Sequence, residues 1–245
     1  MSEAPSPLGA PGLLAGLLPA GAAAVDDDSN GSDPPWPGEE GLIGAAVAAP
    51  SSRRQSIQVR ACARRALALL GEAPCPLPRS PTGAPVWPEG IVGGLTHTDG
   101  YRAAVVARSI AHLGIGVDAE RMRRLPDDLV RTFALPSELG ELVRLRNAGH
   151  PAADALPLAL FTAKEAAFKA WFPATGIWLG PTSADVVFRG RSAFDVVPIV
   201  DGDRRRVRLR GRWAHRSNLV LAVAWLDRDE TTTQGADEAT AGGCL

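Results

Sequence analysis

Residues 161–172 read FTAKEAAFKAWF, a run in which alanine, lysine and glutamate favour an α-helix. Pro157 precedes the run and Pro173 follows it. Because proline restricts the backbone around it, the sequence predicts a helix of about four turns between these two residues. The rest of the chain can be interpreted outward from this helix.

The predicted helix carries an acid and a base on the same face. Glu165 and Lys169 are four residues apart, a spacing that makes them neighbours on a helix surface. Beside them runs an apolar stripe at helical spacing, formed by Phe161, Phe168 and Phe172. A charged pair at the margin of a buried stripe could line a cleft. The alternative is an ordinary surface ion pair, which contributes only a few tenths of a kcal/mol.

A second informative segment, residues 114–120, reads GIGVDAE. Its apolar residues alternate with polar or small ones, as in a half-buried strand, so Asp118 and Glu120 project from the same face. Two carboxylates on one face repel each other, and Mg²⁺ with water and phosphate ligands would relieve that repulsion. Gly114 and Gly116 would let backbone or ligand approach closely. The alternative is a strand end entering a solvated loop and neutralised by the arginines that follow, Arg121, Arg123 and Arg124.

Together the two segments resemble the signature of the 4′-phosphopantetheinyl transferases. That signature is a G-[IV]-D-x-E strand followed along the chain by a W/F-x-x-K-E-A-x-x-K helix. Here the strand motif is GVDAE at residues 116–120 and the helix motif is FTAKEAAFK at residues 161–169. The order, the separation and the residue types all agree with the signature.

Composition narrows the class of protein. A chain of 245 residues with 45% hydrophobic and 22% charged residues can bury a sizeable core, as one domain or two halves. Its net charge of −1 argues against a general nucleic-acid binder. The cysteines, at unrelated positions 62, 75 and 244, indicate neither a disulfide framework nor a metal site and fit a reducing cytoplasm. The apolar run at residues 13–24 is broken by Pro19 and has no Lys or Arg ahead of it, so we expect a short core element rather than a signal or membrane segment.

An arginine-rich stretch occurs where the pattern turns helical, between residues 39 and 70. Arg53 and Arg60 are seven residues apart and share a face if the helix is continuous. Guanidinium groups bind phosphate bidentately, although a solvated helix face would also explain such residues. The stretch resembles the R-R-x-x-F-x-x-x-R-x-C-A-R segment of the enterobactin-synthase-component-D branch, with Ile57 in place of Phe. The resemblance implies that Arg53 and Arg60 bind phosphates of coenzyme A.

Residues 82–101 read TGAPVWPEGIVGGLTHTDGY. His97 lies between turn residues and could be a general base, a phosphate contact or a hydrogen-bonded structural residue; with no other ligand at suitable spacing, a metal ligand is disfavoured. The run resembles the family segment G-x-P-x-W-P-x-G-V-V-G-S-[IL]-[ST]-H-x-x-G-Y-R-A-A, which cradles coenzyme A. Gly94 stands where the family usually has Ser, so a hydroxyl contact would be absent there. The resemblance implies coenzyme A contacts at Thr82, Gly83, Ala84, Pro85, Thr96 and His97.

The C-terminal part predicts a helix that begins near Leu135, with Ser137 as its N-cap, followed by strands. The segment GIWLG at residues 176–180 resembles the family's R-W-L-G turn with Ile177 in place of Arg, and implies a coenzyme A contact at Leu179. Arginines alternate along another predicted strand, which favours a solvated sheet face over a docking surface for an acidic carrier protein; they are Arg206, Arg208, Arg210 and Arg212.

The resemblance implies an α+β fold, a pseudo-dimer of two similar α/β halves with the active site in the cleft between them. The expected divisions are an N-terminal extension with an acidic loop (1–40), an N-terminal coenzyme A-binding half (41–111), a C-terminal metal-binding and catalytic half (112–228) and a disordered tail (229–245). A chain that carries both halves needs no partner to complete the cleft, so we expect a monomer.

The resemblance also implies a reaction, the transfer of 4′-phosphopantetheine from coenzyme A to a serine of an acyl, aryl or peptidyl carrier protein. Such carriers serve fatty-acid, polyketide, siderophore or non-ribosomal peptide biosynthesis. Glu165 is the expected base and Lys169 the residue that steadies the phosphate, with Lys164 a less certain contact. Mg²⁺, or Mn²⁺ in its place, would be held by Asp118, the Ala119 carbonyl, Glu120 and Glu165, so that Asp118, Glu165 and Lys169 also face coenzyme A.

Three alternatives remain from the residues alone. A DNA- or RNA-binding module would need a net basic domain with aromatic platforms, and the sequence has neither. Another Mg²⁺-dependent enzyme acting on coenzyme A or nucleotide phosphates would keep the acidic residues, but would not explain the long loop before His97. A catalytically silent protein that binds coenzyme A or a carrier should have lost one of the charged site residues. All of these are present, namely Asp118, Glu120, Glu165 and Lys169.

Overall fold

The computed structural model describes residues 8–9, 12–28, 34, 36–37, 39, 50–201, 203–204 and 207–228. Of residues 8–9, 50–53 and 203–204 it describes the backbone alone. The predicted tail at 229–245 and Arg206 therefore lie outside the described residues, as does the side chain of Arg53. In the described part no helix is both long enough and apolar enough to cross a bilayer.

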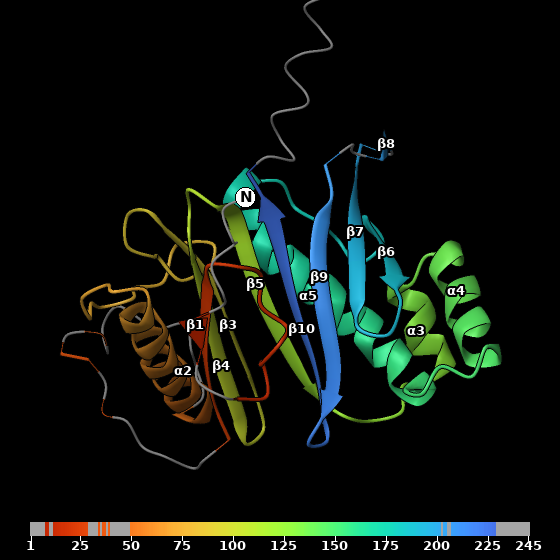
Figure 1. Cartoon of the computed structure of the whole chain (residues 1–245), viewed down its shortest axis with the longest axis horizontal. Coiled ribbons are helices and arrows are strands. Elements are labelled where there is room, and N and C mark those ends of the chain that lie inside the picture. The colour runs from red at the N-terminus through yellow and green to blue at the C-terminus, as the bar shows by residue number, and fades with distance from the viewer. Residues whose placement is uncertain are drawn as a thin grey trace, which may run out of the picture.

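The N-terminal half is a small sheet with one helix on its outer face (Figure 1). Its strands are β1 (Leu8–Gly9), β2 (Ala22–Asp27), β3 (Ile91–Thr98) and β4 (Tyr101–Arg108), in the spatial order β1-β2-β4-β3. The helix α2 (Pro50–Leu69) packs its Cys62, Ala66 and Leu67 against Ala23 and Val106 of the sheet. The predicted division near Ala111 falls in the turn after β4, while β2 pairs with β4 from within the range predicted as an extension.

The C-terminal half is a larger antiparallel sheet covered by a long helix. The spatial order of its strands is β5-β10-β9-β7-β6, with the short β8 (Asp203–Arg204) paired to β7. The bounds are β5 (His112–Arg121), β6 (Ala184–Arg189), β7 (Ala193–Val200), β9 (Leu209–Arg216) and β10 (Leu219–Asp227). Helix α5 (Leu156–Thr175) crosses the back of this sheet in Figure 1 and contacts β5 and β10 most extensively.

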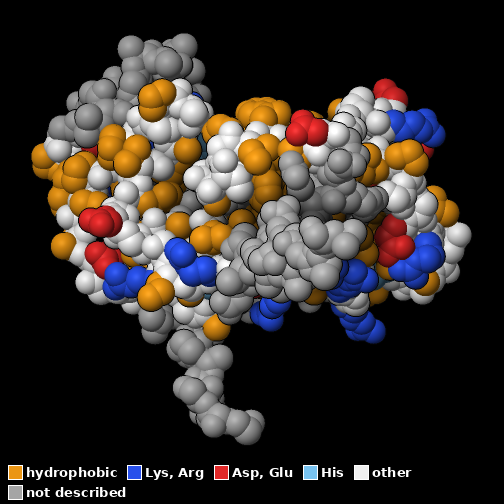
Figure 2. Space-filling model, turned by 90° about the horizontal axis from the view of Figure 1, so that it is seen from above, with side chains coloured by type: hydrophobic (Ala, Val, Ile, Leu, Met, Phe, Trp, Pro, Cys, Tyr) orange, Lys and Arg blue, Asp and Glu red, His pale blue; other side chains and the backbone are white. Residues whose placement is uncertain are grey.

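Shorter helices close the far end of this half. They are α3 (Asp127–Phe133), α4 (Pro136–Asn147) and the 3₁₀ turn η1 (Ala153–Ala155). Seen from above, charged side chains of both signs lie at this end of the molecule, as they do at the other (Figure 2). Within α4, the exposed Arg144 pairs with the partly exposed Glu141. The two α/β halves and their sheets confirm the predicted fold class.

Strand β5 joins the two halves. One of its faces packs against the N-terminal sheet and the other against α5. Its odd-numbered residues Ile115 and Val117 pack against β4 residues such as Val105 in a core shared by both halves. Its even-numbered face meets α5, where any side chain at Gly114 or Gly116 would collide with α5 backbone atoms. The glycines therefore allow close approach of backbone, as their positions in the strand predicted.

Helix α5 corrects two details of the sequence prediction. Pro157 lies in its first turn and Pro173 in its last, so the helix includes both prolines instead of running between them. Proline in the first turn loses no hydrogen bond, because the first amide groups of a helix lack partners in any case. The buried stripe consists mainly of small residues, Ala163, Ala166, Ala167 and Ala170. The phenylalanines expected there are only partly buried.

The start of α4 also differs from the prediction. The N-cap position is Leu135, and Ser137 lies inside the first turn. The Glu138 carboxylate accepts a hydrogen bond from the Leu135 amide at 2.7 Å, while the Ser137 hydroxyl donates to Asp185 at 3.2 Å. A tertiary partner from β6 thus draws Ser137 away from the capping role that its residue type favours locally.

Candidate active site

A cavity of about 910 Å³ lies between the two halves. Its walls come from α2, the loop before β3, the strands β3 and β5, and the C-terminal part of α5. The sequence-predicted residues that line it are Arg60, Thr82, Gly83, Ala84, Pro85, Thr96, His97, Asp118, Ala119, Glu120 and Lys169. Segments that are far apart in the sequence therefore meet at one place.

Three predicted residues, one of them the less certain Lys164, line a smaller neighbouring cavity of about 160 Å³. Glu165 and Leu179 are among its walls, and Phe168 and Trp178 separate it from the larger cavity by lining both. Glu165 is half-buried and Leu179 is buried. Arg53 lies in α2, where the structure describes its backbone but not its side chain.

Asp118 is the centre of the polar contacts on β5. The Lys169 ammonium donates to Asp118 Oδ1 at 2.7 Å and to the Val117 carbonyl at 3.2 Å. The Thr96 hydroxyl of β3 donates to the same carboxylate oxygen at 3.2 Å. The other oxygen, Oδ2, is buried and has no hydrogen-bond partner in the described part of the chain. An unpartnered buried carboxylate oxygen is costly unless a ligand or cation contacts it.

Glu165 lies close enough to the acidic residues of β5 to feel their charge. Burial raises its pKa, and the carboxylates of Asp118 and Glu120 raise it further, while Lys169 opposes them. Acids with raised pKa values in a cleft are typical of sites that move protons or bind cations. Glu120 itself forms an ion pair with Arg123 at 2.7 Å, so its carboxylate is drawn toward solvent.

The chemistry of these groups fits a hard divalent cation. Asp118 offers a free buried oxygen, and the Asp118, Glu120 and Glu165 carboxylates repel one another in a way that a cation would relieve. Among the described residues, however, no three acidic, histidine or cysteine side chains are already gathered at metal-binding distance. Glu120 would have to leave Arg123 for the acidic side chains to act together.

His97 lies near the end of β3 and lines the same cavity as Lys169. His97 is exposed at the surface, yet the cavity walls partly desolvate its imidazole, and this desolvation lowers its pKa. The Lys169 ammonium lowers the pKa further. A neutral imidazole can donate one hydrogen bond without adding charge, and an incoming phosphate would favour its protonation.

Two groups in the cavity wall escaped the sequence analysis. Arg79 donates from Nε to the Gly83 carbonyl at 3.1 Å, beside Arg60. It lies in a proline-rich loop, where no periodic pattern indicates which way a side chain points. The other group is aromatic: Phe168, Phe172 and Trp178 contact one another, and Trp178 is 70% exposed. The spacing of the phenylalanines was its only signal, and that spacing had been interpreted as core.

Lys164, a less certain candidate for contact with coenzyme A, instead holds α5 to its neighbours. Its ammonium donates to the carbonyl oxygens of Pro181 and Ala184, both at 2.7 Å, and pairs with the buried Glu138 at 2.9 Å. Burial raises the pKa of Glu138 and lowers that of Lys164, and the attraction between them opposes both effects. The side chain therefore fixes α5 against α4 and β6.

The structure gives a steric reason for glycine at position 94, which the sequence did not reveal. A β-carbon at this position would lie 2.9 Å from the Gly116 Cα and 3.0 Å from the Val117 amide nitrogen. Both are backbone atoms of β5, which cannot move aside as a flexible side chain could. The close crossing of β3 and β5 leaves no room for a side chain, and it brings Thr96 next to Asp118.

Comparisons with known proteins give a consistent result. Residues 38–107 match the sequence model of the 4′-phosphopantetheinyl transferase N-terminal domain, and residues 114–224 match that of the 4′-phosphopantetheinyl transferase superfamily. The first match ends in β4 and the second begins in β5, so the boundary between them falls where the chain passes from one sheet to the other.

Three curated relatives cover most of the chain. The 4′-phosphopantetheinyl transferase PptT of Mycobacterium tuberculosis is 41% identical over 86% of this chain and 96% of its own length. Npt of Nocardia iowensis is 37% identical over 87% of this chain and 100% of its own length. Svp of Streptomyces mobaraensis is 37% identical over 93% of this chain and 95% of its own length. Npt and Svp are also named 4′-phosphopantetheinyl transferases.

Proposed function

The chain belongs to the 4′-phosphopantetheinyl transferase superfamily, and on that premise we propose how its cavity performs the reaction. The protein is an enzyme that transfers the 4′-phosphopantetheine arm of coenzyme A to a carrier protein, converting the apo form to the holo form. The observation that supports the assignment of the site best is the convergence of Asp118, Lys169 and His97 on one cavity between the halves.

Coenzyme A would bind along the wall formed by α2, the loop before β3, and β3 itself. Arg60 and His97 offer donors for its phosphates, and the Thr82–Pro85 segment forms the adjoining wall. Thr96 lies at the junction, since its hydroxyl already contacts Asp118. Arg79, next to Arg60, adds a second positive charge for the same anionic groups.

Mg²⁺, or Mn²⁺ in its place, would be held by the carboxylates of Asp118, Glu120 and Glu165 and by the Ala119 carbonyl. Bound there, the ion would neutralise charge on the pyrophosphate of coenzyme A. The free oxygen of Asp118 and the raised pKa of Glu165 support this assignment. Leu179 would pack beside Glu165 and shield it from solvent.

The chemical step is a phosphoryl transfer, in which positioning and charge neutralisation supply most of the catalysis. The hydroxyl oxygen of the carrier serine attacks the phosphorus that bears the pantetheine group. The bond from that phosphorus to the adenosine phosphate breaks, and adenosine 3′,5′-bisphosphate leaves. Glu165 takes the serine proton, directly or through a water molecule. Lys169 stabilises the negative charge that develops on the transferred phosphoryl group.

The partners that we propose are coenzyme A and acyl, aryl or peptidyl carrier proteins of fatty-acid, polyketide, siderophore or non-ribosomal peptide biosynthesis, without nucleic acid or membrane. Because both halves of the cavity come from one chain, we propose a monomer. The thiols of Cys62 and Cys75 are free, which supports a reducing, cytoplasmic location.

Intact-mass measurement of a purified apo carrier protein tests this function. Incubation with the enzyme, coenzyme A and Mg²⁺ should add about 340 Da, the phosphopantetheine increment of this transfer. The gain should vanish when coenzyme A is omitted and when EDTA is added. If several unrelated carriers show no gain although coenzyme A binds, the protein is a binder or uses another acceptor. A gain that persists in EDTA would contradict the metal assignment alone.

A further inference from the structure

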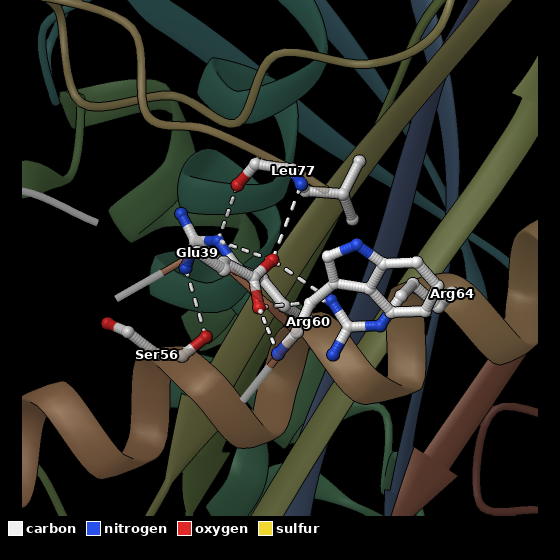
Figure 3. A network of polar contacts seen from close by, with 6 residues as sticks. Glu39, Ser56, Arg60, Arg64 and Leu77 are labelled. Atoms are coloured by element: carbon white, nitrogen blue, oxygen red, sulfur yellow. Dashed lines mark hydrogen bonds and ion pairs between the residues drawn. The ribbon is translucent and has the colours of Figure 1, made fainter. Parts of the chain in front are cut away.

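A carboxylate is buried between two arginines of helix α2. Glu39 is 0% exposed, Arg60 5% and Arg64 8%. Figure 3 shows the Glu39 carboxylate between the two guanidinium groups, above the helix. A carboxylate so far from water persists only if it is paired and hydrogen-bonded. The mechanism above makes no use of this residue.

In the described part of the chain, the hydrogen bonds to this carboxylate all come from groups that do not line the cavity. Arg64 Nη1 donates to both Glu39 oxygens, at 2.9 and 3.1 Å. The Leu77 amide donates to Oε1 at 3.3 Å and the Trp36 amide to Oε2 at 3.4 Å. The Arg64 guanidinium also lies 5.3 Å from the centre of the Trp36 ring. Glu39 therefore ties α2 to the segment before the helix and to the loop after it.

Arg60 is held in a different way. Its Nε donates to the Leu77 carbonyl at 2.7 Å and its Nη1 to the Ser56 carbonyl at 3.0 Å. The distance from Nε to Glu39 Oε1 is 3.9 Å, an ion-pair contact without a hydrogen bond. Its remaining nitrogen, Nη2, donates to no residue in the described part of the chain, and Arg60 lines the large cavity. Glu39 thus attracts Arg60 without using up its donors.

Charge explains why such an arrangement is needed. Arg60 and Arg64 are four residues apart on one helix face, so two like charges are buried side by side. Burial disfavours the charged form of Arg60, and Arg79 and Arg64 disfavour it further; Glu39 is the group that opposes them. Arg60, Arg64 and Glu39 together carry one net positive charge, and of the three residues only Arg60 lines the cavity.

We propose that Glu39 is a positioning residue for coenzyme A, holding Arg60 against the Leu77 carbonyl so that its free nitrogen meets a phosphate. The proposal rests on the proposed function, because it takes the cavity to be the coenzyme A site. The proposal and simple electrostatics predict opposite changes in anion binding when the Glu39 charge is removed. Coulomb's law alone predicts that removing a negative charge near an anion site strengthens anion binding. Positioning predicts that the same change weakens it.

Titration calorimetry with coenzyme A distinguishes the two effects. In Glu39→Gln we expect Kd to rise by about tenfold, within the range for residues coupled in one network. KM for coenzyme A should rise by a similar factor, while kcat stays within about twofold because chemistry occurs at Glu165 and Lys169. Equal or tighter binding by this variant would overturn the proposal.

A double variant separates position from charge and from folding. Glu39→Gln with Arg64→Gln removes one charge of each sign, so the net charge is unchanged and the Arg64 guanidinium is not left buried without its carboxylate. We expect its Kd to rise as in the single variant, although Arg64 does not line the cavity. Kd equal to that of the unmodified protein would refute the positioning role even if the single variant did not fold.

A matched control is Glu72→Gln, which removes another carboxylate paired with an arginine of the same half, Arg108, outside the cavity. It should bind coenzyme A as the unmodified protein does. If the unmodified protein does not bind coenzyme A, the proposed function fails together with this role. If it binds and Glu39→Gln binds equally well, only the role of Glu39 fails.

Discussion

The Lys169 ammonium lies 2.7 Å from Asp118 Oδ1, so a single side chain of α5 reaches the acidic strand at the point where both halves meet. The contact gives Asp118 one charged partner and leaves its second oxygen free. The pair fixes α5 to β5, while Thr96 of the N-terminal half donates to the same oxygen, and both side chains of the pair would face the phosphates of the substrate. Because Lys169 is partly exposed at the cavity, the contribution of this ion pair to stability should be modest.

Replacing Glu165 with glutamine should reduce the transfer rate by about 10²- to 10⁴-fold, the usual contribution of a general base. Coenzyme A affinity should change less than the rate, because the proposed phosphate donors Arg60 and His97 and the other proposed metal ligands are unchanged. The intact-mass assay gives the rate, and calorimetry gives the affinity. Glu141→Gln, which removes a partly exposed carboxylate of α4 away from the cavity, is the matched control and should keep full activity. A Glu165→Gln enzyme with an unchanged rate would exclude the base assignment.

Gly94→Ala should destabilise the protein by about 1–3 kcal/mol, because the new methyl group meets the backbone of Gly116 and Val117. Gly140→Ala provides the contrast, since nothing lies within 4 Å of a β-carbon at that site in α4. There alanine should stabilise by about 0.5–1 kcal/mol through helix propensity. Urea unfolding of both variants measures the difference. Equal effects at the two positions would mean that β3 and β5 can move apart freely.

Breaking the buried pair between Lys164 and Glu138 should cost about 3–5 kcal/mol in either single variant, Lys164→Met or Glu138→Gln, since each leaves a buried charge unpaired. The double variant should recover much of that loss. The exposed pair of Glu141 and Arg144 should contribute under about 1 kcal/mol. A double-mutant cycle based on unfolding free energies tests the coupling. Additive single losses would show that the two charges act independently.

His112 should make stability depend on pH above about 6.5, the ordinary pKa of the residue. Burial alone would lower its pKa, but hydrogen bonds to the Asp227 carboxylate and the Ala20 carbonyl raise it overall. Arg210, 3.6 Å from Asp227, competes for the same carboxylate. A histidine with a raised folded pKa contributes its full stability below the unfolded pKa and loses it as pH rises through the folded pKa.

The comparison with His112→Gln isolates this effect, because other titrating groups such as His97 and Glu138 are present in both proteins. The unfolding free energy of the unmodified protein minus that of the variant should fall between pH 6 and pH 8. Each unit by which the folded pKa is raised corresponds to about 1.4 kcal/mol of that difference. Chemical unfolding at several pH values measures it, and a pH-independent difference would contradict the charged state of His112.

Local patterns were enough to predict several features. The alternation in residues 114–120 predicted that Asp118 and Glu120 lie on one face of a strand, and both residues are in β5. The spacing of Glu165 and Lys169 placed them on one helix face, and α5 contains both. These are properties of neighbours along the chain, fixed by the periods of strand and helix. The order of the two motifs also indicated the family that the comparisons confirm. The roles of the site residues stay predictions.

Other features depended on contacts between residues far apart in sequence. The need for glycine at position 94 comes from Gly116, the partner of Lys164 is Glu138, and the carboxylate between Arg60 and Arg64 is that of Glu39. The local signal at each residue was ambiguous: Gly94 suggested an absent hydroxyl and Lys164 a less certain ligand contact, and both stay predictions. Periodicity determines which face of an element a side chain occupies. The tertiary structure decides what that face meets, because packing and charge pairing depend on all the elements brought together in the fold.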